Sequence, residues 1–334
     1  MKQNKLWTWI LTGLAVFFTH AVLISAEPSG KVMLYSSMQE PQIEAIKEGF
    51  EKKYPKIQMD YYFAGTGKVV TKIATEQQSG QVAADIIWVG DPTNYINYKK
   101  QGILAKYDSP EAAAIDAKFK DPDGYFVGSR LVIVGFGYNT DLVKPADAPK
   151  NWEDLLDPKW KDQIVITDPG TAGTTRFAVD ALMTNSEFGA AYFEKLKANG
   201  AELESGTTAT HTKVAAAAYK VGVCLDYVTA TMKQEGSLMD FVYPEKNLIS
   251  ITSPIGLVKG CANEENGKLL YDFILSKEGQ EILVANNLTT VRSDIPQEGG
   301  MSIAEIAKRS MQIDVDVIVE KDEEVLATFD KIFK

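Results

Sequence analysis

Cysteine and histidine are scarce in this chain, and their scarcity limits the chemistry that it can carry. The 334 residues include two cysteines, Cys224 and Cys261, and two histidines, His20 and His211. With so few of them, Ser–His–Asp triads and zinc sites built from histidine and cysteine are poorly supplied with residues. The motifs Gly-x-Ser-x-Gly, His-Glu-x-x-His and Cys-x-x-Cys are also absent. The sequence therefore favours a protein that is not an enzyme, with no catalytic residue and no cofactor.

Uncharged apolar stretches are short everywhere except at the N-terminus. Lys2 and Lys5 precede an uncharged run from Leu6 to Ile24, and the small residue Ala26 follows. This pattern predicts a cleavable signal peptide over residues 1–26. An uncleaved anchor is the alternative, because the run is nearly long enough to span a bilayer. No cysteine lies near the cleavage point to carry a lipid, so we expect a free periplasmic protein.

Positive charge is in deficit. The chain has 35 basic and 45 acidic residues, and without the two N-terminal lysines 33 basic residues face the same 45 acids, a net charge of −12. Such a surface argues against nucleic acid as a partner. A small anion bound by local backbone dipoles remains compatible with it. In an oxidising compartment Cys224 and Cys261 could form one disulfide, or they could remain two separate buried thiols.

Strands alternate with helices along the chain. The runs 32–35, 57–63 and 84–89 have the pattern of buried strands, and each is followed by a turn and a helical pattern. This alternation predicts an α/β fold with a mainly parallel sheet. Roughly three hundred residues exceed one ordinary core, so we expect two domains. The β-rich runs 129–139 and 249–258 have the pattern of strands that cross between them.

The predicted division follows from these crossings. Residues 27–134 and 254–334 form the first lobe, and residues 135–253 form the second. Ligands of parallel α/β sheets bind beyond the carboxyl ends of the strands. The turns after those strands are the place to look for a site.

A hydroxyl-rich turn opens the helix that follows the strand at Ile164. The first N–H groups of a helix have no partner within it and attract anions. The same kind of turn recurs near Ser36, Thr66 and Ser205. The predicted ligand-binding residues lie in these turns and at neighbouring strand ends: Ser36, Ser37, Thr66, Gly67, Asp91, Thr171, Gly173, Thr174, Thr175, Ser205, Thr207, His211, Asp226 and Tyr227.

Two further residues have alternative interpretations. His211 is a ligand contact or a solvated residue at a helix start. Arg130 clamps an anion with its two-pronged guanidinium, or forms an ordinary surface ion pair. The sequence alone leaves both choices open.

Six segments of the chain carry a family resemblance: 34–37, 84–88, 151–161, 168–169, 255–263 and 271–280. They resemble the extracellular solute-binding proteins of ABC importers. The subgroup is the one usually named for ferric iron, which also contains binders of sugar phosphates and aminoethylphosphonate. The resemblance implies a two-lobed type II periplasmic binding protein fold with two crossing hinge strands that closes on a ligand. It also implies an inner-membrane permease and its ATPase as partners, and we expect a monomer.

The residues favour an organic anion over iron. Ferric-binding members resemble one another in two adjacent tyrosines at the segment matching 224–228, where this chain has Asp226 and Tyr227. The adjacent Tyr61 and Tyr62 lie in a predicted strand, so they point to opposite faces. We therefore expect a sugar phosphate or phosphonate. The alternatives are ferric iron held by Tyr227 and Asp226, and, less favoured, a secreted hydrolase with paired carboxylates.

Overall fold

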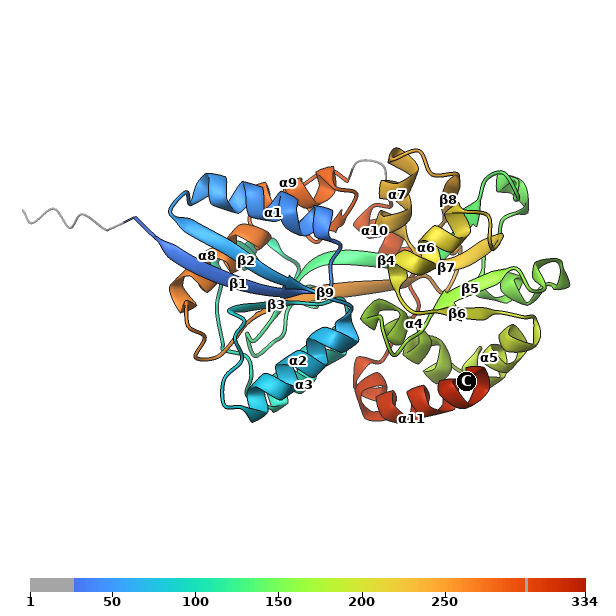
Figure 1. Ribbon diagram of the computed structural model, residues 1–334, viewed down its shortest axis with the longest axis horizontal. Coiled ribbons are helices and arrows are strands. Elements are labelled where there is room, and N and C mark those ends of the chain that lie inside the picture. The colour runs from blue at the N-terminus through green and yellow to red at the C-terminus, as the bar shows by residue number, and fades with distance from the viewer. Residues whose placement is uncertain (1–26, 298–299) are drawn as a thin grey trace, which may run out of the picture.

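The protein consists of two lobes joined by two long strands (Figure 1). The computed structural model describes residues 27–297 and 300–334, so the predicted signal peptide lies outside the described residues. Within the described ranges, no helix combines the length and apolar character needed to cross a membrane. The predicted α/β fold is confirmed.

The first lobe is built on three parallel strands in the order β2-β1-β3. Each strand is followed by a helix, as the alternating sequence pattern predicts. The apolar stripe of the first helix, Ile43, Ile46 and Phe50, is completely buried against the sheet. The elements are β1 (Gly30–Ser36), α1 (Glu40–Lys53), β2 (Ile57–Phe63), α2 (Thr66–Gln78), β3 (Ile86–Trp88), α3 (Thr93–Lys100), α8 (Glu264–Leu275) and α9 (Lys277–Ala285).

The second lobe repeats this construction. Its parallel strands β7, β5 and β6 are neighbours in the sheet, and β8 pairs with the long strand β4. The elements are β5 (Ile164–Thr167), α4 (Gly173–Thr184), α5 (Gly189–Ala198), β6 (Glu202–Glu204), α6 (Thr207–Ala215), β7 (Val221–Leu225), α7 (Asp226–Gln234) and β8 (Met239–Val242).

Two antiparallel strands run through both lobes. They are β4 (Val127–Asn139) and β9 (Ile249–Leu257), paired from Val127 with Ile255 to Val134 with Ile249. Beyond this ladder β4 pairs with β7 of the second lobe, and β9 pairs with β3 of the first. The predicted crossing strands are confirmed, and they carry the cleft between the lobes.

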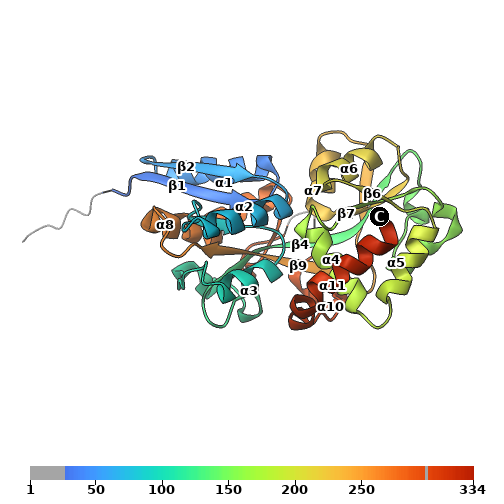
Figure 2. The ribbon, with the colours of Figure 1, turned by 60° about the horizontal axis from the view of Figure 1, so that its bottom comes forward.

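The C-terminal segment differs from the prediction. After β10 (Thr289–Thr290) and α10 (Ile303–Arg309), the helix α11 (Val315–Phe333) packs against α4 and α5 of the second lobe (Figure 2). Its buried face includes Phe329, whose ring centroid lies 5.4 Å from that of Phe193. The predicted division places this helix in the first lobe, whereas it packs mainly on α4 and α5 of the second lobe and makes a smaller contact with α3 of the first.

The two cysteines are free and buried. Cys224 lies in β7 and packs with Val165, Val214 and Met239. Cys261 follows β9 on the first-lobe side, beside Asp85. The predicted disulfide option is therefore wrong, since the thiols belong to different lobes, and the alternative of two buried thiols holds. Burial raises the pKa of each thiol to about 12, which keeps both in the unreactive protonated form.

We expect a reducing agent to leave the thermal unfolding temperature unchanged, because there is no bridge to break. Loss of a native disulfide would cost about 2–4 kcal/mol. The measurement is a melting curve with and without dithiothreitol, with thiol labelling of the native and unfolded protein as its control. A clear fall in the melting temperature with reductant would contradict the free-thiol structure.

Candidate functional site

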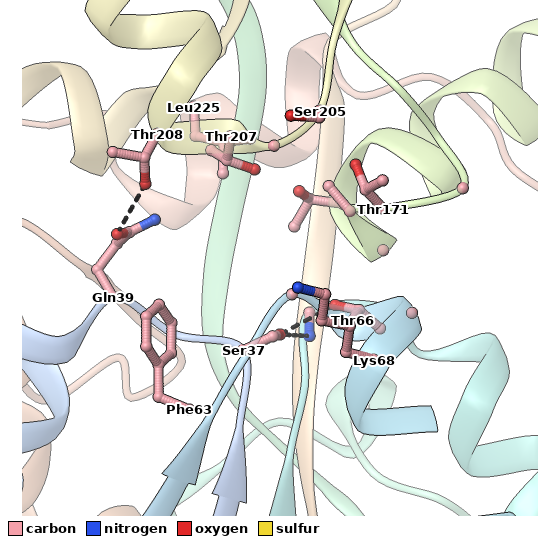
Figure 3. Close-up of a pocket in the computed structure, with 18 of the residues that line it drawn as sticks. Ser37, Gln39, Phe63, Thr66, Lys68, Thr171, Ser205, Thr207, Thr208 and Leu225 are labelled. Atoms are coloured by element: carbon pink, nitrogen blue, oxygen red, sulfur yellow. Dashed lines mark hydrogen bonds between the residues drawn. The ribbon is translucent and has the colours of Figure 1, made fainter. Parts of the chain in front are cut away.

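A cleft of about 860 Å³ lies between the lobes, where the turns after several strands meet (Figure 3). This volume is in the range of small-molecule binding sites. The first lobe contributes the ends of β1 and β2 and the start of α2, and the second contributes the starts of α4 and α6. Nine of the predicted residues line it: Ser37, Thr66, Gly67, Thr171, Gly173, Thr174, Ser205, Thr207 and Tyr227.

Three helices begin at this cleft without a side-chain cap. The residues before α2, α4 and α6 are Gly65, Ala172 and Gly206, and none provides a capping hydrogen bond. The first N–H groups of each helix therefore lack partners within the helix and from a capping side chain. Helix starts of this kind provide N–H donors and partial positive charge for an anion.

Ser37 connects the first-lobe turns. Its Oγ accepts hydrogen bonds from Thr66 Oγ1 at 3.0 Å and from the Gly90 N–H at 3.2 Å (Figure 3). A capping box between Ser37 and Glu40, which the sequence suggests, does not form, since Gln39 is the N-cap residue of α1. The Ser37 hydroxyl therefore faces the cleft and keeps its own proton for another acceptor.

The lobes approach closely on both sides of the cleft. A Cβ atom on Gly67 would lie 2.7 Å from the Gly170 carbonyl oxygen, and one on Gly173 would lie 2.8 Å from Thr66 Cγ2. Across the cleft, Thr208 Oγ1 donates to Gln39 Oε1 at 3.3 Å (Figure 3). Gly67 and Gly173 are thus needed for the close approach of the backbones of the two lobes.

Arg130 is a buried charged residue that lines the cleft. It lies in β4 and is 1% exposed, and its Nε and Nη1 have no hydrogen-bond partner among the described residues. Its guanidinium carbon lies 5.8 Å from the ring centroid of Trp88 and 5.2 Å from that of Tyr227. The surface ion pair that the sequence left open is therefore excluded. Buried cations are normally paired, so this guanidinium has unused hydrogen-bond donors at the cleft.

Three predicted residues support the cleft without lining it. Ser36 Oγ donates to the Trp88 carbonyl oxygen at 2.8 Å, and Asp91 accepts from the N–H and the hydroxyl of Thr93. Thr175 lies in a small apolar pocket with Trp152. These positions correct the expectation that all three meet the solute, because neighbouring residues of a strand or helix face different directions.

His211 and Asp226 are also turned away. The His211 ring is fully buried, and its Nε2 accepts from the Leu225 N–H at 3.0 Å. Its Nδ1 lies 2.7 Å from the Thr207 carbonyl oxygen and so carries the proton. Burial lowers the pKa of His211, so the ring is neutral. Asp226 accepts from the Ile133 N–H at 3.1 Å, which leaves only one residue of the predicted alternative metal pair, Tyr227, facing the cleft.

Sequence reasoning missed several lining residues. Those that carry polar or aromatic groups are Gln39, Tyr62, Phe63, Lys68, Thr71, Lys72 and Thr208. Tyr62 lines the cleft while the hydroxyl of Tyr61 donates to Glu44, so the two tyrosines have different surroundings, as strand alternation requires. The signal that could have located the others is their position beside the predicted turns at the end of β2 and the start of α6.

Comparison with known proteins now identifies the class. Residues 83–303 match the family model described as "Bacterial extracellular solute-binding protein", and the chain belongs to this family. It is a periplasmic solute-binding protein of ABC transport, a class of binding component that works with a permease and an ATPase.

Sequence relatives agree with this assignment. The chain is 32% identical over 239 residues to a protein of Salmonella typhimurium (strain LT2) named for binding 2-aminoethylphosphonate, and the match covers 67% of this chain and 66% of that protein. It is 29% identical over 293 residues to an uncharacterised protein of Haemophilus influenzae, covering 84% of this chain and 83% of that one.

Solved structures agree in fold. The periplasmic binding protein AfuA of Actinobacillus pleuropneumoniae, with fructose-6-phosphate bound, is 26% identical with a TM-score of 0.79, and the match covers 91% of this chain and 98% of that one. Iron-bound HitA of Pseudomonas aeruginosa is 20% identical with a TM-score of 0.79, over 91% of this chain and 99% of that one. The second likeness shows the fold alone.

A buried acid lies behind the cleft, on α4. Asp180 is 0% exposed, and neither carboxylate oxygen receives a hydrogen bond within the described part of the chain. Arg176 Nε lies 3.4 Å from it but donates to Asp322 of α11 at 2.8 Å. Burial raises the pKa of Asp180 from 3.8 to about 9, so at neutral pH the native carboxyl holds a proton.

We expect Asp180→Asn to reduce the loss of stability between pH 5 and pH 8. Because the native carboxyl keeps a proton that the unfolded chain releases above about pH 4, stability falls as pH rises through this window, by about 1 kcal/mol per pH unit. An amide does not titrate, so the melting temperature of the variant should rise relative to that of the wild type as pH rises. The exposed Asp141→Asn is the control, and parallel curves for Asp180→Asn and the wild type would refute this account.

Proposed function

We propose that the cleft captures a small organic anion, such as a sugar phosphate or a phosphonate, for transfer to a permease and ATPase in the inner membrane. The observation that carries this proposal is Arg130, which is buried in the lining of the cleft without a carboxylate partner. Taking a charge out of water costs several kcal/mol. A bound anion offsets that cost, because it supplies the missing charge-assisted hydrogen bonds.

The rest of the lining supports an oxyanion. The uncapped starts of α2, α4 and α6 offer N–H donors, and the hydroxyls of Ser37, Thr174 and Thr207 lie beside them. A phosphate or phosphonate group accepts several such bonds at once, and a buried donor left unpaired is costly, which makes the arrangement selective. The relatives named for 2-aminoethylphosphonate, and the one with fructose-6-phosphate bound, are consistent with this class of solute.

Ferric iron is less well served by the same residues. Two tyrosines, Tyr62 and Tyr227, line the cleft, but the described lining residues include no carboxylate and no histidine. A hard cation prefers several anionic oxygen ligands, and the positive charge of Arg130 opposes it. The hydrolase alternative also lacks its chemistry, since paired carboxylates are missing from the described lining. The organic-anion proposal therefore stands above both.

Arg130→Met should weaken binding of an organic anion at least about tenfold, because a charge-assisted hydrogen bond contributes about 1.5–3 kcal/mol. Calorimetric titration with fructose 6-phosphate, 2-aminoethylphosphonate and ferric citrate measures this. Arg130→Lys keeps the charge and loses the two-pronged guanidinium, so its affinity for the anion should lie between those of the wild type and Arg130→Met. Without ligand, Arg130→Met should melt no lower than the wild type, since it removes a buried charge whose Nε and Nη1 have no hydrogen-bond partner among the described residues. Unchanged anion affinity in Arg130→Met, or binding of ferric citrate alone, would contradict the proposal.

Two adjacent threonines give a matched test of the lining. Thr174 lines the cleft, whereas Thr175 faces the apolar pocket beside Trp152. Thr174→Val should weaken binding of the best anion about tenfold, because one hydroxyl is lost at nearly constant volume. Thr175→Val should leave affinity nearly unchanged. A larger loss of affinity in Thr175→Val than in Thr174→Val would contradict the assignment of Thr174 to the binding site.

A further inference from the structure

The residues that line the cleft carry positive charge only. Arg130, Lys68 and Lys72 line it, and within the described chain no aspartate or glutamate does so. The protein as a whole has a net charge of −10, so this is a local reversal of sign. It concerns the whole solute, because the cleft is larger than one phosphate group.

Four acids near the lining are engaged by donors of the protein. Asp168 accepts from the Gly170 N–H at 2.8 Å and lies 3.0 Å from Lys334 Nζ. Glu76 accepts from the Tyr35 hydroxyl at 2.8 Å and from the Ala83 N–H at 3.0 Å.

Two further acids are engaged in the same way. Asp91 accepts from the N–H and the hydroxyl of Thr93 at the start of α3, and Asp226 accepts from the Ile133 N–H. None of the four lines the cleft, and the described lining contains no other carboxylate to receive a cationic group of the solute.

Lys68 is the unpaired cation of the first-lobe wall. Lys72 Nζ lies 2.6 Å from Glu76 Oε1 and sits over the rings of Tyr35 and Tyr62, so its charge is largely compensated. Lys68, one turn earlier on α2, is exposed and forms no ion pair with any residue that the structure describes. Its charge therefore acts on whatever part of the solute extends from Arg130 along α2.

We propose that the cleft selects anions that carry no ammonium group, and that Lys68 is a specificity-determining residue. This inference rests on the proposed function, since it assumes that an anionic group of the solute meets Arg130. An ammonium group would lose its water, find no carboxylate and meet like charge. The remainder of the solute is then hydroxylated or negatively charged. The chain differs in this respect from the activity named for its 2-aminoethylphosphonate-binding relatives.

Two matched pairs of ligands test the inference by calorimetric titration. One pair is 2-hydroxyethylphosphonate and 2-aminoethylphosphonate, and the other is glucose 6-phosphate and glucosamine 6-phosphate. Within each pair a hydroxyl replaces an amine and the anion stays the same. At about pH 6.5, below the usual pKa of amines, we expect the hydroxyl member of the better-binding pair to bind at least tenfold more tightly. The ratio should shrink at high salt, because screening weakens the repulsion.

Lys68→Met identifies the residue responsible. It should reduce the preference for the hydroxyl member several-fold, because it weakens the binding of that ligand and removes the repulsion between Lys68 and the amine. Lys52→Met is the matched control, because Lys52 is an exposed lysine of α1 outside the cleft, and it should leave the ratio unchanged.

The possible results separate this inference from the proposed function. Tighter or equal binding of the amine member, with Arg130→Met still weakening it, would overturn the inference and leave the anion proposal intact. An unchanged ratio in Lys68→Met would remove Lys68 from the specificity role. Failure of all four ligands to bind would overturn the anion proposal, and the inference with it.

Discussion

An unpaired guanidinium between two lobes is the constraint on which the site depends. Arg130 lies in the strand that both lobes share, packed near the rings of Trp88 and Tyr227. Those rings come from the two lobes, Trp88 from β3 and Tyr227 from α7. The charge thus sits where relative movement of the lobes alters its surroundings most. On the proposed function, an anion that met Arg130 would lie beside residues of both lobes, so its binding would couple to any relative movement of the lobes.

The three uncapped helix starts follow the same logic. A serine or aspartate at the N-cap would typically stabilise each helix by about 1 kcal/mol. The chain has Gly65, Ala172 and Gly206 there instead. Each helix therefore lacks the stabilisation of a capping side chain, and its first N–H groups remain available to a solute. Such local loss of stability is common at binding sites. Glycine at position 65 also permits a close approach of the other lobe, since a Cβ there would lie 2.7 Å from the Thr171 carbonyl oxygen.

Local patterns predicted the fold and part of the site. Alternating strands and helices, and turns with hydroxyls, are short-range signals, so the lobes, the crossing strands and lining residues such as Thr174 could be found. The position of α11 depends on which helix its apolar face meets, and that is a contact between distant segments. The prediction that His211 and Asp226 face the ligand missed a similar contact, since backbone N–H groups of Leu225 and Ile133 donate to their side chains and hold them away from the cleft.

Arg130 shows the limit of sequence reasoning most clearly. Its place in an apolar strand is compatible with an ion pair, and only the three-dimensional arrangement shows that no described acid lies within ion-pair distance of it, although its charge acts on the nearby Asp226. The same arrangement engages neighbouring acids such as Asp91 and Asp226 with donors of the protein, so in a chain with ten more acidic than basic residues the charged residues of the described lining are all cations. Acids spread over the surface repel an approaching anion only weakly beyond about 10 Å, because salt screens their charges. In the proposed function, therefore, the local sign of the cleft, rather than the net charge, governs which solute binds.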